Sequence, residues 1–340
     1  MKIHVKHVSL FSVFILLTLT LSLSGAYGWT RGPPPVTPST TGTTITGFNG
    51  PWAFAFDPNN NEVFVANTNG NTVSVISDAT DTIIATITVG TTTTSYPSGL
   101  AFDSHLDEIF VVNYGDNTVS VISDATNTVI ATIPGFNEPD GVGFDSHLNE
   151  IFVGNGGTNT VMVISDATNK VIKTITVDDS PTGIVFDPHN REVYVTNTGY
   201  TGGGNTVSVI SDATNKVITD ITVSYCPYAA VFDSHNNEIY VTNMYAATIS
   251  VISDSTNTVI KTIAGQSGPM GAALDPHDNK VYVTNMWSYT VSLISGETDT
   301  ITRTLTTLGL DFPAAIVFDP HTNQLFIANY YSNTVSVIPD

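Results

Sequence analysis

The sequence predicts an all-β fold, a seven-bladed β-propeller with four antiparallel strands in each blade. Two observations carry this prediction. A unit of 42 to 46 residues occurs seven times, and each unit contains four short apolar runs separated by turn-forming residues. The composition agrees, because charged residues make up only 12% of the chain whereas Ser, Thr, Asn and Gly are abundant, as in strands joined by tight turns.

An Asp and an Asn mark each unit. The Asp ends the first apolar run, and the Asn, ten residues later, ends the second. We expect the Asp carboxylate to accept backbone N–H groups and so to fix the turn between these two strands. The Asp residues are Asp57, Asp103, Asp145, Asp187, Asp233, Asp275 and Asp319.

The third unit illustrates the four strands, which we name A to D. Strand A is expected at 141–144, strand B at 150–155, strand C at 160–165 and strand D at 170–177. The last unit stops after strand C, whereas residues 44–51 resemble residues 132–139, where a strand D ends. We therefore predict that an N-terminal strand completes the seventh blade and closes the ring, which leaves no open edge between the first and last blades.

Small residues recur in strand A, two positions after the Pro that opens each blade. We expect strand A to be innermost, so that these residues crowd the central tunnel, where only Gly or Ala fits readily. They are Ala53, Gly99, Gly141, Gly183, Ala229, Gly271 and Ala315. The residue between the Pro and the small residue differs in every blade and is expected at the mouth of the tunnel, which is the usual concave site of such a fold.

Strand B ends in Tyr-Val-Thr-Asn at 194–197, 240–243 and 282–285, and in the other four units its last four residues start with Phe and end with Asn. Through these motifs the chain resembles the YVTN-repeat β-propeller family of surface-layer-like proteins over residues 44–340. The resemblance implies a seven-bladed propeller, export, and a binding or surface role. It does not settle activity, because a minority of related propellers are enzymes or subunits of redox enzymes.

The N-terminus predicts export. Lys2 and Lys6 precede an apolar run at 8–23 that small residues follow, so residues 1–26 are expected to be a signal peptide. Residues 27–43 are expected to be a Pro/Thr-rich linker, and 44–340 the propeller. We expect a secreted, extracellular protein that can be attached to the cell surface, with no stable membrane span unless the leader stays uncleaved. The formal charge of −20 disfavours a nucleic-acid partner.

Binding is expected on the face that carries the B–C and D–A loops. These loops vary in length and are rich in aromatic residues, whereas 22 of the 30 acids lie in the A–B and C–D turns of the opposite face. The candidate ligand-binding residues are Trp52, Asp140, Tyr228, Met244, Tyr245, Met270, Met286, Trp287, Tyr289 and Tyr331. The expected ligand is a cell-surface glycan, a peptide or a partner protein. The alternative is that these side chains only pack across the loop surface.

The expected function is therefore a non-enzymatic binding or structural module. An alternative is a lyase or lactonase that acts at the tunnel mouth with Asp140 as its acid. We expect no cofactor and no metal site, because the six His residues at one repeat position should lie too far apart to share an ion, and a turn role explains them. Calcium binding by the Asp ring stays open, although no EF-hand pattern is present. The only cysteine is Cys226, which excludes an internal disulfide.

Overall fold

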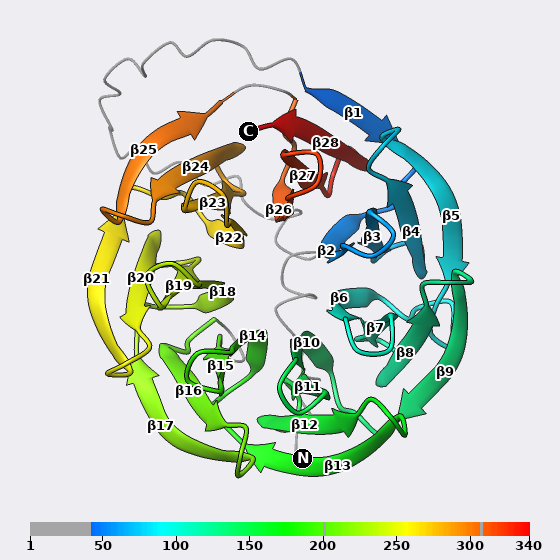
Figure 1. Ribbon diagram of the computed structural model, residues 1–340, viewed down its shortest axis with the longest axis horizontal. Coiled ribbons are helices and arrows are strands. Elements are labelled where there is room, and N and C mark those ends of the chain that lie inside the picture. The colour runs from blue at the N-terminus through cyan, green and yellow to red at the C-terminus, as the bar shows by residue number, and fades with distance from the viewer. Residues whose placement is uncertain (1–41, 200–201, 307–308) are drawn as a thin grey trace, which may run out of the picture.

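The computed structural model describes residues 42–199, 202–306 and 309–340. These residues form seven antiparallel sheets of four strands each, arranged as blades around a central axis (Figure 1). The elements of the described part of the chain are all strands, and it contains no helix that is long and apolar enough to cross a membrane. The predicted fold class is thus confirmed.

Blades one to six each follow the chain from the innermost to the outermost strand. The strands of blades one to three are β2 (Pro51–Asp57), β3 (Glu62–Asn67), β4 (Thr72–Ser77), β5 (Thr82–Thr88); β6 (Pro97–Asp103), β7 (Glu108–Asn113), β8 (Thr118–Ser123), β9 (Thr128–Pro134); and β10 (Pro139–Asp145), β11 (Glu150–Asn155), β12 (Thr160–Ser165), β13 (Lys170–Thr176). The strands of blades four to six are β14 (Pro181–Asp187), β15 (Glu192–Asn197), β16 (Thr206–Ser211), β17 (Lys216–Thr222); β18 (Pro227–Asp233), β19 (Glu238–Asn243), β20 (Thr248–Ser253), β21 (Thr258–Ala264); and β22 (Pro269–Asp275), β23 (Lys280–Asn285), β24 (Thr290–Ser295), β25 (Thr300–Leu305).

Blade seven joins the two ends of the chain. It contains β26 (Pro313–Asp319), β27 (Gln324–Asn329) and β28 (Thr334–Pro339), with β1 (Thr43–Thr46) as its outermost strand. β1 runs antiparallel to β28, with Thr43 opposite Val337 and Ile45 opposite Val335 (Figure 1). The predicted closure of the ring is confirmed. The predicted signal peptide at 1–26, and the predicted linker up to residue 41, lie outside the described residues.

Strand A begins earlier than predicted. In blade three β10 starts at Pro139, because Pro139 pairs with Asn155 at the far end of strand B. The register then shifts before Val142 pairs with Val153. Such a bulge leaves extra residues on one strand and changes the direction of their side chains. The residues in the bulge include Asp140, whose position in the tunnel is therefore set by the Pro that opens the blade.

The Tyr-Val-Thr-Asn segment connects adjacent blades. The Thr196 hydroxyl donates to the carbonyl oxygen of Tyr228 in blade five at 2.8 Å. The Tyr194 hydroxyl donates to the side-chain oxygen of Asn257, also in blade five, at 2.6 Å. The side-chain amide of Asn197 instead donates to hydroxyl groups of strand C in its own blade. The motif therefore joins one sheet to the next at both ends of a buried strand, where each hydrogen bond contributes about 1 kcal/mol.

The small residues of strand A line the tunnel and lie close to strand A of the neighbouring blade. A Cβ atom on Gly141 would stand 1.4 Å from the carbonyl oxygen of Thr182, and one on Gly183 would stand 2.4 Å from the carbonyl oxygen of Tyr228. Both of these oxygens belong to strand A of the next blade. The predicted position of the small residues at the tunnel is confirmed, and the close contacts that limit their size are made sideways with the adjacent inner strand.

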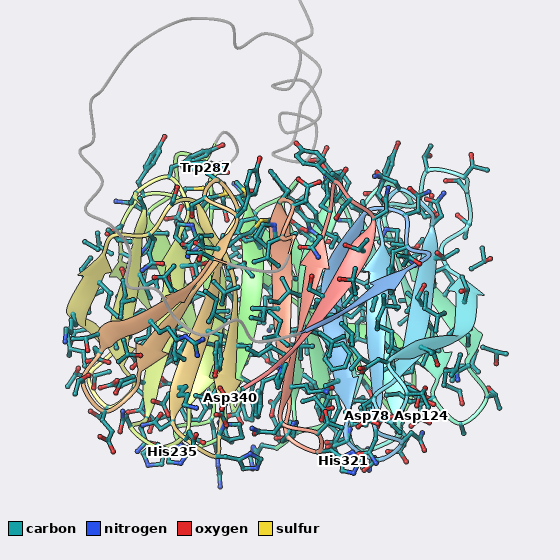
Figure 2. The ribbon with its side chains drawn as sticks, turned by 90° about the horizontal axis from the view of Figure 1, so that it is seen from above. Asp78, Asp124, His235, Trp287, His321 and Asp340 are labelled. Carbon is teal, nitrogen blue, oxygen red and sulfur yellow. The ribbon has the colours of Figure 1, made fainter. Side chains whose placement is uncertain are left out.

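The face of the A–B and C–D turns, here the turn face, carries the repeated His residues. Their backbone N–H groups donate to the repeat Asp at 2.8 Å, as expected for a turn. Sequence reasoning missed a second contact: in four blades the imidazole Nδ1 lies 2.7 to 2.8 Å from an Asp of the following blade. These pairs are His105–Asp166, His147–Asp212, His189–Asp254 and His321–Asp78. Figure 2 shows His235 and His321 on this face, opposite Trp287.

Candidate functional site

The loop face, formed by the B–C and D–A loops, carries aromatic rings on blades five, six and seven. We call Tyr225, Tyr245, Trp287, Tyr289, Phe312, Tyr330 and Tyr331 the aromatic arc. Three of these occupy the same place, two residues after the Asn that ends strand B: Tyr245, Trp287 and Tyr331. The other four blades have Asn69, Gly115, Gly157 and Gly199 there. The arc therefore breaks the sevenfold repeat on one side of the ring.

The centre of the arc is a stacked pair. The rings of Tyr245 and Trp287 lie 5.9 Å apart between centroids with planes 15° from parallel, and Tyr225 lies 6.2 Å from Tyr245. Tyr225 is 48% exposed, Trp287 46%, Tyr289 48% and Tyr331 44%. Large rings exposed to this extent on adjacent loops form a rigid apolar surface whose hydroxyl and indole groups can also hydrogen-bond.

A second group of rings continues the arc on blade seven. Phe312 lies 4.6 Å from Tyr331 and 5.8 Å from Tyr330, and these two tyrosines lie 5.3 Å from each other. Trp52 of blade one packs edge-on against Tyr330 at 5.3 Å. The group thus connects the exposed rings to the mouth of the central tunnel.

Two glycines allow the central rings to lie flat on the loop backbone. A Cβ on Gly268 would stand 2.6 Å from the indole Cδ2 of Trp287, and a Cβ on Gly202 would stand 2.3 Å from Cε2 of Tyr245. Both glycines also have positive φ, +64° and +76°, which favours Gly over other residues. The backbone therefore supports both rings from below, and the orientation of the pair is set before any ligand arrives.

Tyr289 has an unusual backbone conformation. Its φ is 56°, in the left-handed region that bulky residues rarely adopt. The repeat explains the conformation, because the equivalent residues Asn71, Asn117, Asn159 and Asn333 have φ between 52° and 58° and accept backbone N–H groups of a D–A loop through their side chains. A Tyr cannot replace that carboxamide acceptor, so blade six carries strain of about 1 kcal/mol to present an aromatic ring.

The candidate Met residues lie beneath the arc rather than on its surface. Met244 and Met286 are fully buried and Met270 nearly so, in one apolar cluster with Cys226 and Trp52. They follow directly after strand B or lie in strand A, where their flexible side chains fill the space below the rings. Their contribution is to support the surface rings. Burial also raises the pKa of the Cys226 thiol to about 12, so it stays protonated and unreactive.

The mouth of the central tunnel is lined by residues from all seven inner strands around a cavity of about 240 Å³. The indole of Trp52 donates a hydrogen bond to the Tyr228 hydroxyl, which joins blade one to blade five across the mouth. Asp140 is the acid among the lining residues that the structure describes. It keeps some surface toward the cavity, yet protein surrounds its carboxyl group, and this burial raises its pKa to about 6 although a hydrogen bond from Ser98 opposes the shift.

The ten sequence-predicted residues thus separate into three positions. Tyr245, Trp287, Tyr289 and Tyr331 lie on the surface of the arc, Met244 and Met286 lie below it, and Trp52, Asp140, Tyr228 and Met270 line the tunnel mouth. Sequence reasoning did not select Tyr225, Phe312 and Tyr330. A signal existed for Tyr330, which directly follows its strand-B Asn as Met244 and Met286 do. Tyr225 and Phe312 lie in D–A loops with no shared motif, and only the fold brings them to the arc.

Comparisons with known proteins identify the fold. No family model matches the chain, and no curated protein matches its sequence. Many solved structures match its fold, among them hydrazine synthase from Kuenenia stuttgartiensis, with a TM-score of 0.75 and 17% sequence identity over 92% of this chain and 99% of the other. At this identity the likeness establishes a shared β-propeller architecture.

Proposed function

We propose that the protein is a non-enzymatic binding module whose aromatic arc binds an extracellular glycan. The stacked Tyr245–Trp287 pair carries this proposal. The apolar C–H face of a sugar ring packs against a flat aromatic ring, while the sugar hydroxyl groups exchange hydrogen bonds with tyrosine hydroxyls at the edge of the surface. The arc offers such partly exposed rings on neighbouring loops.

A glycan fits the arc better than a peptide or a folded partner for two reasons. The arc is restricted to three of the seven blades, and its exposed rings are few, whereas a protein partner usually requires about 800 Å² on each side. Its rings are also held by glycines and by left-handed backbone, so the surface is flat and fixed rather than adaptable. A rigid stacking surface of this kind saves the entropy of ordering side chains on binding.

The proposed location is outside the cell, either secreted or attached to its surface, as the leader and the resemblance to YVTN-repeat surface-layer-like propellers suggest. A surface-attached propeller would then present its loop face to the glycan.

Calorimetric titration of the propeller with a panel of soluble polysaccharides and oligosaccharides tests this function. We expect at least one glycan to bind the wild-type protein, and the Tyr245→Ala/Trp287→Ala variant to bind it at least tenfold more weakly, because a stacking contact on an aromatic side chain contributes about 1–3 kcal/mol where nucleic-acid bases make it. Ile130→Ala is the matched control, since Ile130 is 51% exposed but lies on the outer strand β9 of blade two. The proposal fails if both variants bind as the wild type does, or if only peptides bind.

A further inference from the structure

We propose that Asp145, His147 and Asp212 bind one divalent cation, Zn²⁺, at the junction of blades three and four on the turn face. Asp145 and His147 come from the turn between β10 and β11, and Asp212 follows β16 of the next blade. One ligand atom from each residue lies within 4.8 Å of the other two. This site is separate from the aromatic arc, and its test does not depend on the proposed glycan binding.

Asp145 supplies a carboxylate oxygen without a partner. Its Oδ1 atom accepts the backbone N–H groups of His147 at 2.8 Å and Leu148 at 3.2 Å, which fixes the turn. Its Oδ2 atom has no hydrogen-bond partner although the residue is 0% exposed, and the same holds for the repeat Asp of blades one, two, four and six. The junction of blades three and four differs in that its Asp, His and Asp ligand atoms all lie within 4.8 Å of one another. A buried carboxylate oxygen without a donor costs several kcal/mol unless a positive group satisfies it. The turn therefore needs only one oxygen of Asp145, and the other is available to a cation.

The other two ligands are already close to the required separation. His147 Nδ1 lies 2.8 Å from Asp212 Oδ2. Two ligands on one tetrahedral zinc ion, each bonded at about 2.0 Å, stand roughly 3.3 Å apart. A shift of about half an ångström would therefore place the ion between them. The imidazole side chain is 38% exposed, which leaves access for the ion and for a water molecule as a fourth ligand.

The kind of cation follows from the donor set. One imidazole nitrogen and two carboxylate oxygens suit a borderline ion such as zinc better than calcium, which takes six to eight oxygens. From the repeat spacing, we expect that His residues of neighbouring blades cannot share an ion. The structure instead brings one His together with an Asp of its own blade and an Asp of the next, a combination that the repeat spacing alone did not reveal.

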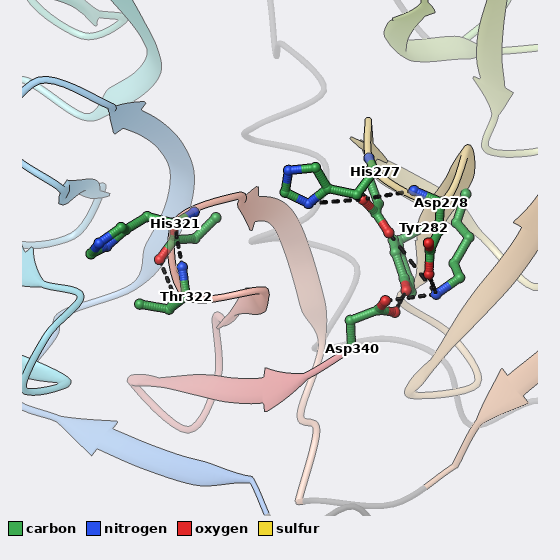
Figure 3. Close-up of polar contacts among 9 residues, drawn as sticks. His277, Asp278, Tyr282, His321, Thr322 and Asp340 are labelled. Carbon is green, nitrogen blue, oxygen red and sulfur yellow. Dashed lines mark hydrogen bonds and ion pairs between the residues drawn. The ribbon is translucent and has the colours of Figure 1, made fainter. Parts of the chain in front are cut away.

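In blade six, a lysine side chain neutralises the carboxylates that gather at the corresponding junction with the next blade. The first residue of strand B is Glu in blades one to five, but in blade six it is Lys280. The Lys280 Nζ atom lies 2.6 Å from Asp340 and 2.8 Å from Asp278, within the trio Asp275, Asp278 and Asp340 (Figure 3). That trio and the proposed zinc ligands are the two groups of compact metal-type ligands within the described residues. A protein ammonium group thus occupies one of them.

No such ammonium group neutralises the proposed zinc site. The strand-B position holds Glu150, whose carboxylate adds a further negative charge beside Asp145 and Asp212. Within the described part of the chain, the ion pair recorded for Asp212 is the one with His147, and none joins Asp145 or Asp212 to Lys or Arg. Three carboxylates therefore face one imidazole, and a divalent cation would balance them as Lys280 does in blade six.

Calorimetric titration of chelator-treated protein with ZnCl₂ tests the site, with CaCl₂ as the comparison ion. We expect about one equivalent of Zn²⁺ to bind, a rise in Tm on zinc addition, and a much weaker response to Ca²⁺. His147→Ala and Asp145→Asn should each weaken zinc binding at least tenfold. Asp145→Asn keeps a side-chain oxygen for the turn, so it distinguishes loss of a ligand from loss of the fold, and its unfolding curve in the absence of zinc checks this point.

His235→Ala is the matched control. His235 has the same turn, with its N–H donating to Asp233 at 2.8 Å, but Gly296 takes the place of the Asp from the next blade. Zinc binding by this variant should equal that of the wild type. Absence of zinc binding by the wild type would overturn the proposal. So would equal effects of His147→Ala and His235→Ala, which would mean that exposed imidazoles bind the ion without a built site.

Discussion

His321 of blade seven and Asp78 of blade one form an ion pair of 2.7 Å that closes the ring on the turn face. The two residues are 243 positions apart in the sequence. The same closure is made by β1 against β28, and on the loop face by Asn333, whose side-chain oxygen accepts the N–H of Gly50 at 2.7 Å. The join between the ends of the chain therefore uses the contacts that connect the other blades.

The ring-closing pair should make stability depend on pH. The Asp78 carboxylate raises the pKa of His321 above its ordinary value, chiefly through their hydrogen bond. A raised pKa in the folded state means that the charged pair stabilises the protein fully below the unfolded pKa of about 6.5, and that this part is lost as pH rises through the folded pKa. His321→Gln should thus lower Tm more at pH 5.5 than at pH 9. Equal losses of Tm at both values would contradict the assignment.

Asp140 should destabilise the fold when it is charged. Its pKa is raised to about 6 by burial, so ionisation in the folded state is unfavourable, and stability should fall as pH rises from about 4 through 6. Asp140→Asn removes the charge and keeps the shape. We expect it to stabilise the protein by about 1–3 kcal/mol at pH 7.5 and by much less at pH 4, as urea unfolding at the two pH values would measure. A stabilisation that is independent of pH would show that the charge is not responsible.

Tyr289 should lower the stability of the fold while contributing to glycan affinity. Replacing it with Asn restores the residue that four other blades use at this left-handed position, so Tyr289→Asn should stabilise the protein by about 1 kcal/mol. It should also weaken glycan binding, because an exposed ring of the arc is lost. Ala247→Asn is the control, since Ala247 has the same positive φ of 56° in blade five. It should raise stability with no loss of glycan affinity.

The fold was predictable because the same residue pattern recurs in every blade and specifies the same four strands and turns each time. The Asp turns, the buried strand B and the closure by β1 all follow from local residue patterns that occur many times. The contacts between blades were not predictable in the same way. Whether His147 meets Asp212, or Gly141 meets Thr182, depends on the angle between sheets, which no spacing within one unit encodes.

The candidate site was predictable in part for the same reason. Departures from the repeat pointed to Tyr245 and Trp287, and the structure places their rings against each other. Sequence alone could not tell which departures face water. Met244 and Met286 deviate from the repeat as strongly as their neighbours, yet both are buried. The difference between the surface of the arc and its support arises from side-chain direction at the end of strand B, which a motif does not specify.

The fluorescence of Trp287 during titration with an oligosaccharide that binds the protein shows whether the sugar stacks on the aromatic arc. If a sugar stacks on the Tyr245–Trp287 pair, the wild-type emission should change and saturate with the Kd found by calorimetry. The Trp287→Phe variant retains the other two of the three Trp residues and should lose that change. A saturating change that persists in Trp287→Phe, or glycan binding that leaves the wild-type emission unaltered, would contradict binding at the aromatic arc.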